Sequence, residues 1–382
     1  MSDTSWSASE DIEAFRPHLQ RFLINEMAPL AAKWRRQKAV DPDVWPILGQ
    51  FGMLLPSIPA CYGGLGKTFA FDAAIIEDVE KIVPELTHGV MVQNAIIAHY
   101  ILRYASEARK QDWLPRLARG ELIAAIAISE PAAGSDMRAL KMRAARRGGQ
   151  FVLNGQKTFV TNGNVANLLV VAAQAETNNG ADGVSLFVVE TNKCTGFQRG
   201  NNLDKLGLHA SGASELFFDD VAVSADCLLG GLAGQGMRQM TEQLPQERVA
   251  IAVSAVASME RAIELTVKYS KDRVVFGKPV FDFQTNGFTL AEAKTKAFIA
   301  RIFVGWCVER LALGKLDVVA ACMAKWWSTE TQVDIADACL QIHGGYGYME
   351  EYDISRIFID ARAQKIYGGT NEIMKHVIAR SL

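Results

Sequence analysis

Apolar residues recur at three- and four-residue spacing through the first third of the chain. This period is typical of amphipathic helices, which it predicts over residues 24–34, 71–82 and 90–104. Pro56, Pro59 and a glycine-rich run at 63–66 interrupt the pattern as a loop. We therefore expect residues 1–123 to form an N-terminal helical domain.

Short apolar segments separated by Asn, Gly and Ser replace this pattern from residue 124 onwards. Asn154-Gly155 lies between two such segments, at 151–153 and 158–160, and this dipeptide predicts a hairpin turn. Further strands are expected at 168–171, 184–189 and 215–218. Several short strands with turn signals predict a small β-sandwich or barrel over residues 124–235.

Long helices are predicted again from residue 236. Residues 246–276 contain no Gly or Pro, and their apolar positions follow one stripe. Pro245 favours a helix start there, which would place Glu247 in the first turn. A second helix is predicted up to Gly344-Gly345, and Thr370 is expected to N-cap the last one. Residues 236–382 thus predict an antiparallel four-helix bundle, and the whole chain an α+β fold of three domains.

Composition and charge exclude several classes of protein. The 382 residues include 40 Lys and Arg against 42 Asp and Glu, so the net charge of -2 gives no reason to expect nucleic acid or an anionic membrane as partner. No apolar run approaches the ~20 residues that span a bilayer, so no membrane insertion is expected. The start of the chain is acidic and lacks the pattern of a secretory signal or a mitochondrial presequence. We expect a cytoplasmic protein.

Neither the six cysteines nor the six histidines show metal-ligand spacing, since there is no CxxC and no HExxH. Scattered cysteines are typical of small buried side chains in a reducing compartment. No metal site is expected. If the protein is an enzyme, its chemistry would rest on a carboxylate, a borrowed cofactor, or both.

Six motifs occur in one order along the chain, and none is informative alone. They are Ser129-Glu-Pro-Ala-Ala-Gly-Ser-Asp136, Asn154-Gly-Gln-Lys157, Thr161-Asn-Gly163, Arg273 with Phe276-Gly-Lys278, Gln341-Ile-His-Gly-Gly345, and Asp360-Ala-Arg362 followed by Ile366-Tyr-Gly-Gly-Thr370. In this order and spacing the chain resembles the acyl-CoA dehydrogenases over essentially its whole length. That resemblance implies non-covalently bound FAD, an electron-transfer flavoprotein as electron acceptor, and a homotetramer.

The resemblance also implies roles for individual residues. Those expected to line the flavin or the thioester are Ile128, Ser129, Gly134, Ser135, Phe159 and Thr161. Those expected to bind the diphosphate and adenosine part of FAD across a subunit interface are Arg273, Phe276, Gln284, Gln341 and Gly345. Thr370 and Glu372 would lie near the diphosphate at a helix N-terminus. Ser135, Arg248 and Tyr367 are expected to contact the substrate.

This chain lacks the carboxylate that serves as catalytic base in most members of the family. Most members carry a Glu where this chain has Gly368, so the usual carboxylate is missing. The long-chain and isovaleryl branches place the base on the bundle helix that starts with Glu-Arg, which here is Glu247-Arg248. One interpretation is a non-catalytic scaffold that binds flavin or acyl-CoA. The other, which the pairing of Gly368 with Glu247 favours, is an active dehydrogenase with Glu247 as base.

Gly368 retains a backbone N–H, which in this family hydrogen-bonds the thioester carbonyl. The expected reaction is the α,β-dehydrogenation of a long-chain or branched acyl-CoA, with Cα losing a proton and Cβ a hydride. Arg248 is expected either to orient local backbone or to pair with Glu247, which would lower the pKa of that carboxyl. Two related activities stay open, an acyl-CoA oxidase and a dehydrogenase of acyl groups tethered to a carrier protein.

Overall fold

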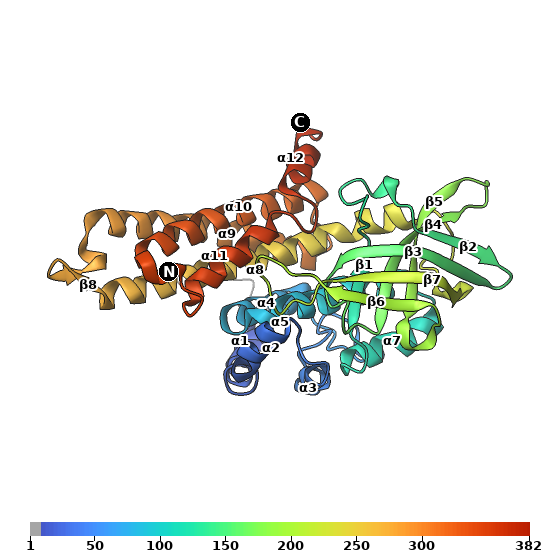
Figure 1. Ribbon diagram of the computed structural model, residues 1–382, viewed down its shortest axis with the longest axis horizontal. Coiled ribbons are helices and arrows are strands. Elements are labelled where there is room, and N and C mark those ends of the chain that lie inside the picture. Colours follow the sequence, from blue (N-terminus) through green and yellow to red (C-terminus); the bar gives the residue numbers. More distant parts are fainter. Residues whose placement is uncertain (1–8) are drawn as a thin grey trace.

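The computed structural model describes residues 9–382, so the first eight residues of the acidic start lie outside the described part. A long helical bundle occupies one end of the molecule and a β-sheet the other, with the N-terminal helices packed beneath their junction (Figure 1). Helix α4 (Phe69–Ile82) packs against α8 (Gly236–Asp272) of the bundle, and residues 92–97 pack against the first strand. This arrangement confirms the expected α+β class with helical, β and helical parts.

The N-terminal part is helical up to residue 118. Its helices are α1 (Glu10–Phe22), α2 (Ala31–Gln37), α3 (Val44–Phe51), α4 (Phe69–Ile82), α5 (Pro84–Met91), α6 (Ala98–Tyr104) and α7 (Glu107–Ala118). A π-helical stretch, Val92–Ile97, joins α5 to α6. Helix α4 is apolar on two faces: Phe71 and Ile75 belong to the N-terminal core, whereas Ala73 and Ile76 belong to the core of the bundle. It therefore links the two cores.

One mixed seven-stranded sheet forms the middle part. Its strands are β1 (Ala124–Ala127), β2 (Arg143–Arg147), β3 (Gln150–Val160), β4 (Leu168–Glu176), β5 (Asp182–Glu190), β6 (Phe197–Asn202) and β7 (Ser214–Ser224). The strand order is β1-β4-β2-β3-β7-β6, and β5 pairs with β4. Strand β4 is almost entirely buried, which explains its continuous apolar sequence.

The hairpin predicted at Asn154-Gly155 is wrong. Both residues lie inside the continuous strand β3, where the register against β7 shifts between Leu153 and Gly155. Gly155 has φ +144°, and a Cβ there would come within 2.9 Å of Met142. The glycine therefore permits an irregularity and a close approach within the strand. The hairpin turn lies instead at Gly148-Gly149, between β2 and β3.

The C-terminal part contains the four long antiparallel helices α8 (Gly236–Asp272), α9 (Gln284–Ala312), α10 (Val318–His343) and α11 (Asp353–Gln364), followed by α12 (Asn371–Ala379). A small hairpin of β8 (Val274–Val275) and β9 (Lys278–Pro279) joins α8 to α9. Thr370 caps α12, as expected, by accepting a hydrogen bond from the Ile373 N–H. Within residues 9–382, no helix is both long enough and apolar enough to span a membrane.

The predicted start of the first bundle helix is wrong. Helix α8 begins at Gly236, so Pro245 lies in its interior and Glu247 about three turns from its start. Proline in a helix removes one backbone hydrogen bond. The turns before it are held by tertiary contacts, because Met240 is buried and the Gln239 side chain donates to the Leu229 carbonyl. The helix dipole therefore does not account for an acid at position 247.

Candidate active site

Glu247 projects from the middle of α8 into the interior, with 7% of the residue exposed. Its Oε1 accepts a hydrogen bond from the Tyr100 hydroxyl of α6 at 3.0 Å. Desolvation raises the pKa of this carboxyl to about 7, against the lowering influence of Tyr100 and of the Arg248 charge. A carboxyl with a pKa near neutrality is suited to taking up and releasing a proton at physiological pH.

Arg248 is not hydrogen-bonded to its neighbour Glu247 among the described residues. Its Nη1 lies 3.2 Å from Cys322 Sγ of α10, and its Nε has no hydrogen-bond partner there. Of the two expected roles, pairing with Glu247 is therefore not observed. Burial, rather than the Arg248 charge, dominates the pKa of Glu247.

Gly368 lies against the same part of α8. Its φ of +67° is a conformation that favours glycine, and a Cβ built there would come within 2.4 Å of Ile251 Cδ1. A Cβ at Gly369 would lie 3.8 Å from the Arg248 guanidinium. Arg248 directly follows Glu247 on α8, and Ile251 lies one turn after it. The Gly368-Gly369 segment and Glu247 therefore belong to one site.

A buried lysine holds this segment in place. Lys325 of α10 is fully buried, and its Nζ donates to the Gly369 carbonyl at 2.8 Å and to Asn371 Oδ1 at 2.9 Å. Desolvation lowers the pKa of Lys325 to about 7, and the nearby charge of Arg248 contributes. Tyr367, the residue before Gly368, is hydrogen-bonded through its hydroxyl to His88 Nε2 at 2.7 Å.

A second group of expected site residues gathers at the start of the sheet. Thr158 N donates to the Ser129 carbonyl at 2.9 Å, so the backbone that follows β1 lies beside the end of β3. The Lys157 ammonium, itself fully buried, donates to the Ile128 carbonyl and to Glu130 Oε1, both at 2.8 Å. This buried ion pair fixes the backbone at Ile128-Ser129 relative to β3.

Phe159 is the most accessible ring of this group. It is 72% exposed, with φ +59°, although a phenylalanine is rarely left in water. Thr161 follows it and is partly buried, while Gly134 and Ser135 lie exposed in the loop after β1. An exposed aromatic face beside hydroxyl and backbone groups suits a flat polar ring system such as a flavin.

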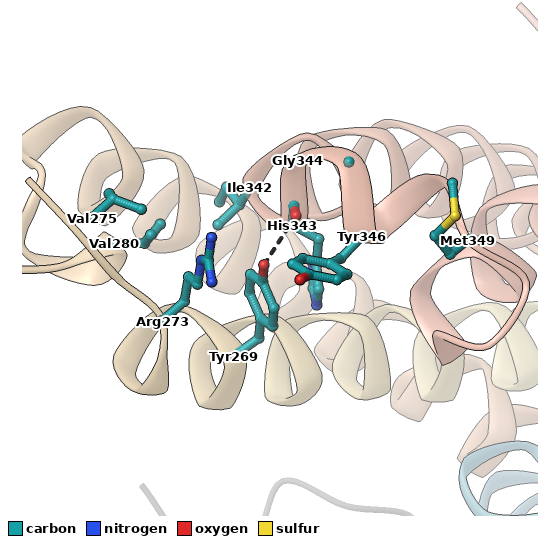
Figure 2. Close-up of a pocket in the computed structure, with 10 residues that line it drawn as sticks. Tyr269, Arg273, Val275, Val280, Ile342, His343, Gly344, Tyr346 and Met349 are labelled. Atoms are coloured by element: carbon teal, nitrogen blue, oxygen red, sulfur yellow. Dashed lines mark hydrogen bonds between the residues drawn. The ribbon is translucent and has the colours of Figure 1, made fainter.

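A third group lies at the far end of the bundle, around a cavity of about 470 Å³. Arg273 and Gly345 line it together with Tyr269, His343 and Tyr346 (Figure 2). The Arg273 guanidinium lies 5.6 Å from the centre of the Tyr346 ring, and the Tyr269 hydroxyl donates to the His343 carbonyl. A cation beside aromatic rings suits a ligand that carries both phosphate and an aromatic base.

The remaining residues of this third group are also exposed. Phe276, at the tip of the β8–β9 hairpin, is 95% exposed, and Gln284 and Gln341 are exposed at the adjoining helix ends. The hairpin lies at the opposite end of the long axis from the sheet (Figure 1). One chain therefore does not bring Arg273, Phe276, Gln284, Gln341 or Gly345 to the flavin-lining candidates in the sheet.

Thr370 and Glu372 lie at the N-terminus of α12, directly after the Gly368-Gly369 segment. The first N–H groups of a helix, with the positive end of its dipole, suit a phosphate group. The structure thus divides the sequence-predicted residues into three groups: one around Glu247 and Gly368, one at the ends of β1 and β3, and one at the β8–β9 end of the bundle.

Comparison with known proteins identifies the family. Three family profiles match in succession, the acyl-CoA dehydrogenase N-terminal domain over residues 9–121, the middle domain over 125–221 and the C-terminal domain over 234–382. The mitochondrial long-chain specific acyl-CoA dehydrogenase of Sus scrofa is 39% identical over 98% of this chain and 87% of its own.

Two solved structures share the fold of the whole chain. The acyl-CoA dehydrogenase of Geobacillus kaustophilus has a TM-score of 0.95 and 42% identity, covering 99% of both chains. A glutaryl-CoA dehydrogenase of Mycobacterium smegmatis, solved in complex with FADH2, has a TM-score of 0.91 and 26% identity, covering 99% of this chain and 96% of its own.

The chain belongs to the acyl-CoA dehydrogenase family. The members of this family are FAD-dependent oxidoreductases. Related enzymes include long-chain specific members, consistent with acyl-CoA α,β-dehydrogenation. The exposed Phe159 ring fits the flat ring system of such a cofactor.

Sequence reasoning missed three residues that hold the site. Tyr100 lies 147 positions before Glu247, and no local pattern connects the two. Lys157 belongs to the Asn154-Gly-Gln-Lys157 motif. This motif predicts an exposed turn, so it gave no indication that the Lys157 side chain is buried. Lys325 sits in an otherwise apolar helical run, where a lone charge is the signal that could have marked it.

Proposed function

We propose that this protein dehydrogenates a long-chain or branched acyl-CoA, with Glu247 as the base that removes the Cα proton. The observation that carries the proposal is a buried carboxyl with a pKa of about 7, held by Tyr100, one turn from Ile251, which a Cβ at position 368 would meet. The Cα–H of a thioester is weakly acidic, so its base must be positioned and desolvated. Glu247 meets both requirements.

Gly368 is proposed to polarise the thioester through its backbone N–H. As the Cα proton leaves, negative charge develops on the thioester oxygen, and a fixed donor stabilises it by ~3–4 kcal/mol. The Lys325 bond to the Gly369 carbonyl orients this segment. The chain would thus keep the polarising group of the usual arrangement while its base comes from another helix.

FAD, when bound, supplies the acceptor for the hydride that leaves Cβ. Ile128, Ser129, Phe159 and Thr161 would hold its ring, with Gly134 and Ser135 beside the thioester. Thr370 and Glu372 would lie at the diphosphate. Arg248 and Tyr367 would contact the acyl-CoA, since both lie beside the Gly368-Gly369 segment.

A homotetramer is proposed to complete the cofactor site. Arg273, Phe276, Gln284, Gln341 and Gly345 would serve the flavin of a neighbouring subunit, because they lie far from the sheet of their own chain (Figure 1). Large apolar side chains along α9 are exposed and support burial between subunits: Phe288, Phe298, Ile299, Ile302 and Trp306. An electron-transfer flavoprotein is the proposed electron acceptor.

The domain limits 1–123, 124–235 and 236–382 remain a proposal. It is supported by β1 starting at Ala124 and α8 at Gly236. A cytoplasmic location is also proposed. It is supported by the absence of any disulfide among the six cysteines, which all lie within residues 9–382.

The proposed function is tested by the flavin spectrum. The purified, FAD-loaded protein is mixed anaerobically with acyl-CoAs of graded length and branching, and flavin bleaching is followed. We expect Glu247→Gln to slow bleaching by at least ~1000-fold, because an amide cannot accept the proton. Glu242→Gln is the matched control, since Glu242 lies on the same helix and is bound by Tyr104. Bleaching at the wild-type rate in Glu247→Gln would refute the assignment.

The same preparation separates the related activities. Oxygen consumption at the rate of turnover would identify an oxidase, and bleaching by carrier-bound acyl groups alone would identify a carrier-dependent enzyme. A colourless protein that takes up no FAD would refute a flavoenzyme altogether.

A further inference from the structure

One hydrogen bond joins the N-terminal helices to the segment that carries the proposed polarising N–H. Nε2 of His88, on α5, lies 2.7 Å from the Tyr367 hydroxyl, and the two rings meet edge to face with their centres 5.3 Å apart. Tyr367 directly precedes Gly368, and 279 positions separate it from His88. The proposed dehydrogenase site uses Tyr367 and Gly368, but it gives no role to His88.

The Gly368 N–H is an open hydrogen-bond donor. The N–H groups of Tyr367 and Asn371, on either side of the glycine pair, donate to carbonyls near the end of α11. Those of Gly368 and Gly369 have no partner among residues 9–382. A backbone donor that the chain leaves unused, beside the part of α8 that carries Glu247, can bond to an oxygen of a ligand.

The direction of this donor depends on how Tyr367 is held, because the Gly368 N–H belongs to the peptide between these two residues. Beyond that peptide, φ is +67° at Gly368 and +88° at Gly369, and glycines rotate about their backbone bonds at little steric cost. Lys325 anchors the far end of the pair at the Gly369 carbonyl. The near end is anchored by the Tyr367 N–H bond to α11 and by the side-chain bond to His88.

Packing alone does not favour a histidine at position 88. Its ring is buried, with 6% of the residue exposed, and Nδ1 has no hydrogen-bond partner in the described part of the chain. An unpaired buried group costs ~1–3 kcal/mol, which an apolar residue would avoid. Burial, with the nearby charge of Lys205, lowers the pKa of His88 to about 4, so the ring is neutral at physiological pH. The bond to Tyr367 is what this residue contributes in return.

We propose that His88 is a positioning residue for the reaction: through the Tyr367 hydroxyl it fixes the peptide whose N–H, at Gly368, binds the thioester oxygen. This inference rests on the proposed dehydrogenase function and adds a residue to its polarising group. Negative charge develops on that oxygen as the Cα proton leaves. A misdirected donor therefore stabilises the transition state less than a well-directed one, whereas binding of the neutral substrate changes little.

The test compares variants of the FAD-loaded protein by anaerobic flavin bleaching at graded acyl-CoA concentrations. His88→Leu and Tyr367→Phe each remove the bond. Each should lower the limiting rate ~10- to 100-fold and change the half-saturating concentration less than about threefold. The double variant should be no slower than the slower single variant, because both changes remove the same interaction. His88→Gln should recover most of the lost rate, since its amide can bond to the same hydroxyl.

Tyr367→Phe keeps the aromatic ring and removes one hydroxyl, so it carries the test if His88→Leu does not fold. Ser57→Ala is the matched control. It breaks another bond between a hydroxyl and a histidine, Ser57 Oγ to His99 Nε2 at 3.0 Å, outside the proposed site. This variant should leave both the limiting rate and the half-saturating concentration unchanged.

A 3-thiaacyl-CoA gives a second readout of the same donor. Its Cα proton can leave, but the sulfur at the β position carries no hydride, so the bound anion accumulates and absorbs at long wavelength beside the oxidised flavin. At fixed pH, we expect the ratio of ionised to neutral analogue to fall ~10-fold in both single variants and to stay unchanged in Ser57→Ala.

Limiting rates and ionisation ratios within about twofold of wild type in both single variants would overturn the inference and leave the bond as packing alone. Losses that multiply in the double variant, or a change confined to the half-saturating concentration, would overturn it too. In each of these cases bleaching of the wild type leaves the dehydrogenase function intact. Absence of bleaching of the wild type by every acyl-CoA would overturn the function and the inference with it.

Discussion

The bond between Tyr100 and Glu247 allows the proposed base to be tested without removing it. The Tyr100 hydroxyl donates to Glu247 Oε1 at 3.0 Å in a fully buried setting, and a hydrogen bond to a carboxylate favours its ionised form. Tyr100→Phe removes only the hydroxyl and keeps the ring in the core. The pKa of Glu247, already raised to about 7 by burial, should therefore rise further.

The size of this shift follows from the energy of the bond. A hydrogen bond to a charged group contributes ~1.5–3 kcal/mol, and ~1.4 kcal/mol corresponds to one pH unit, so the pKa should rise by ~1–2 units. The base must be ionised to accept a proton. With wild type half ionised near pH 7, the variant should react ~5- to 50-fold more slowly there and regain its rate as the pH is raised.

The measurement is the rate of anaerobic flavin bleaching in single-turnover mixing, recorded from about pH 5.5 to about pH 10. Tyr104→Phe is the matched control. Tyr104 lies one turn from Tyr100 and binds Glu242 instead, so its loss should leave the midpoint unchanged. A midpoint in Tyr100→Phe that stays in place or moves to lower pH would refute the role of Glu247 as base.

Four other substitutions test the packing of the site. Glu247→Gln should stabilise the apoprotein by up to ~3 kcal/mol above pH 7 and little at pH 4.5 in urea unfolding. A carboxyl whose pKa is raised from 4.5 to about 7 by folding increasingly destabilises the native state as pH rises between those values. Gly368→Ala should lower the free energy of unfolding by ~1–2 kcal/mol, because φ at this position is +67° and the new Cβ meets Ile251. It should also lower the ratio of the rates with branched and straight acyl-CoAs. Ile251→Val should restore part of that ratio. Lys325→Met should lower kcat ~10-fold with little change in KM, because the Gly369 carbonyl loses its donor.

Local sequence patterns predicted structure well where the pattern itself decides the conformation. The stripe of apolar residues on α8 is buried, with Val249, Val253 and Val256 fully so. Thr370 caps α12, and α10 ends at Gly344. Each of these depends on side chains within one or two turns of the element, which the sequence shows directly.

The same reasoning failed where long-range packing overrode a local signal. Asn154-Gly155 reads as a turn, but pairing of β3 with β7 on one side and β2 on the other keeps the chain extended. Pro245 reads as a helix start, but buried side chains on the preceding turns continue α8 through it. In both cases contacts with distant strands or helices outweigh a local preference of a few kcal/mol.

The sequence by itself determined the order of helical, β and helical parts, the absence of the usual Glu at position 368, and Glu247 as the alternative candidate. These depend on residue identity and spacing along the chain. Only the tertiary structure decided that burial, not Arg248, governs the pKa of Glu247, since desolvation depends on every group packed around the carboxyl. It also brought together Tyr100 and Glu247, Lys325 and Gly369, and Glu80 and Ser254, because contacts between elements far apart in sequence arise only when the chain folds.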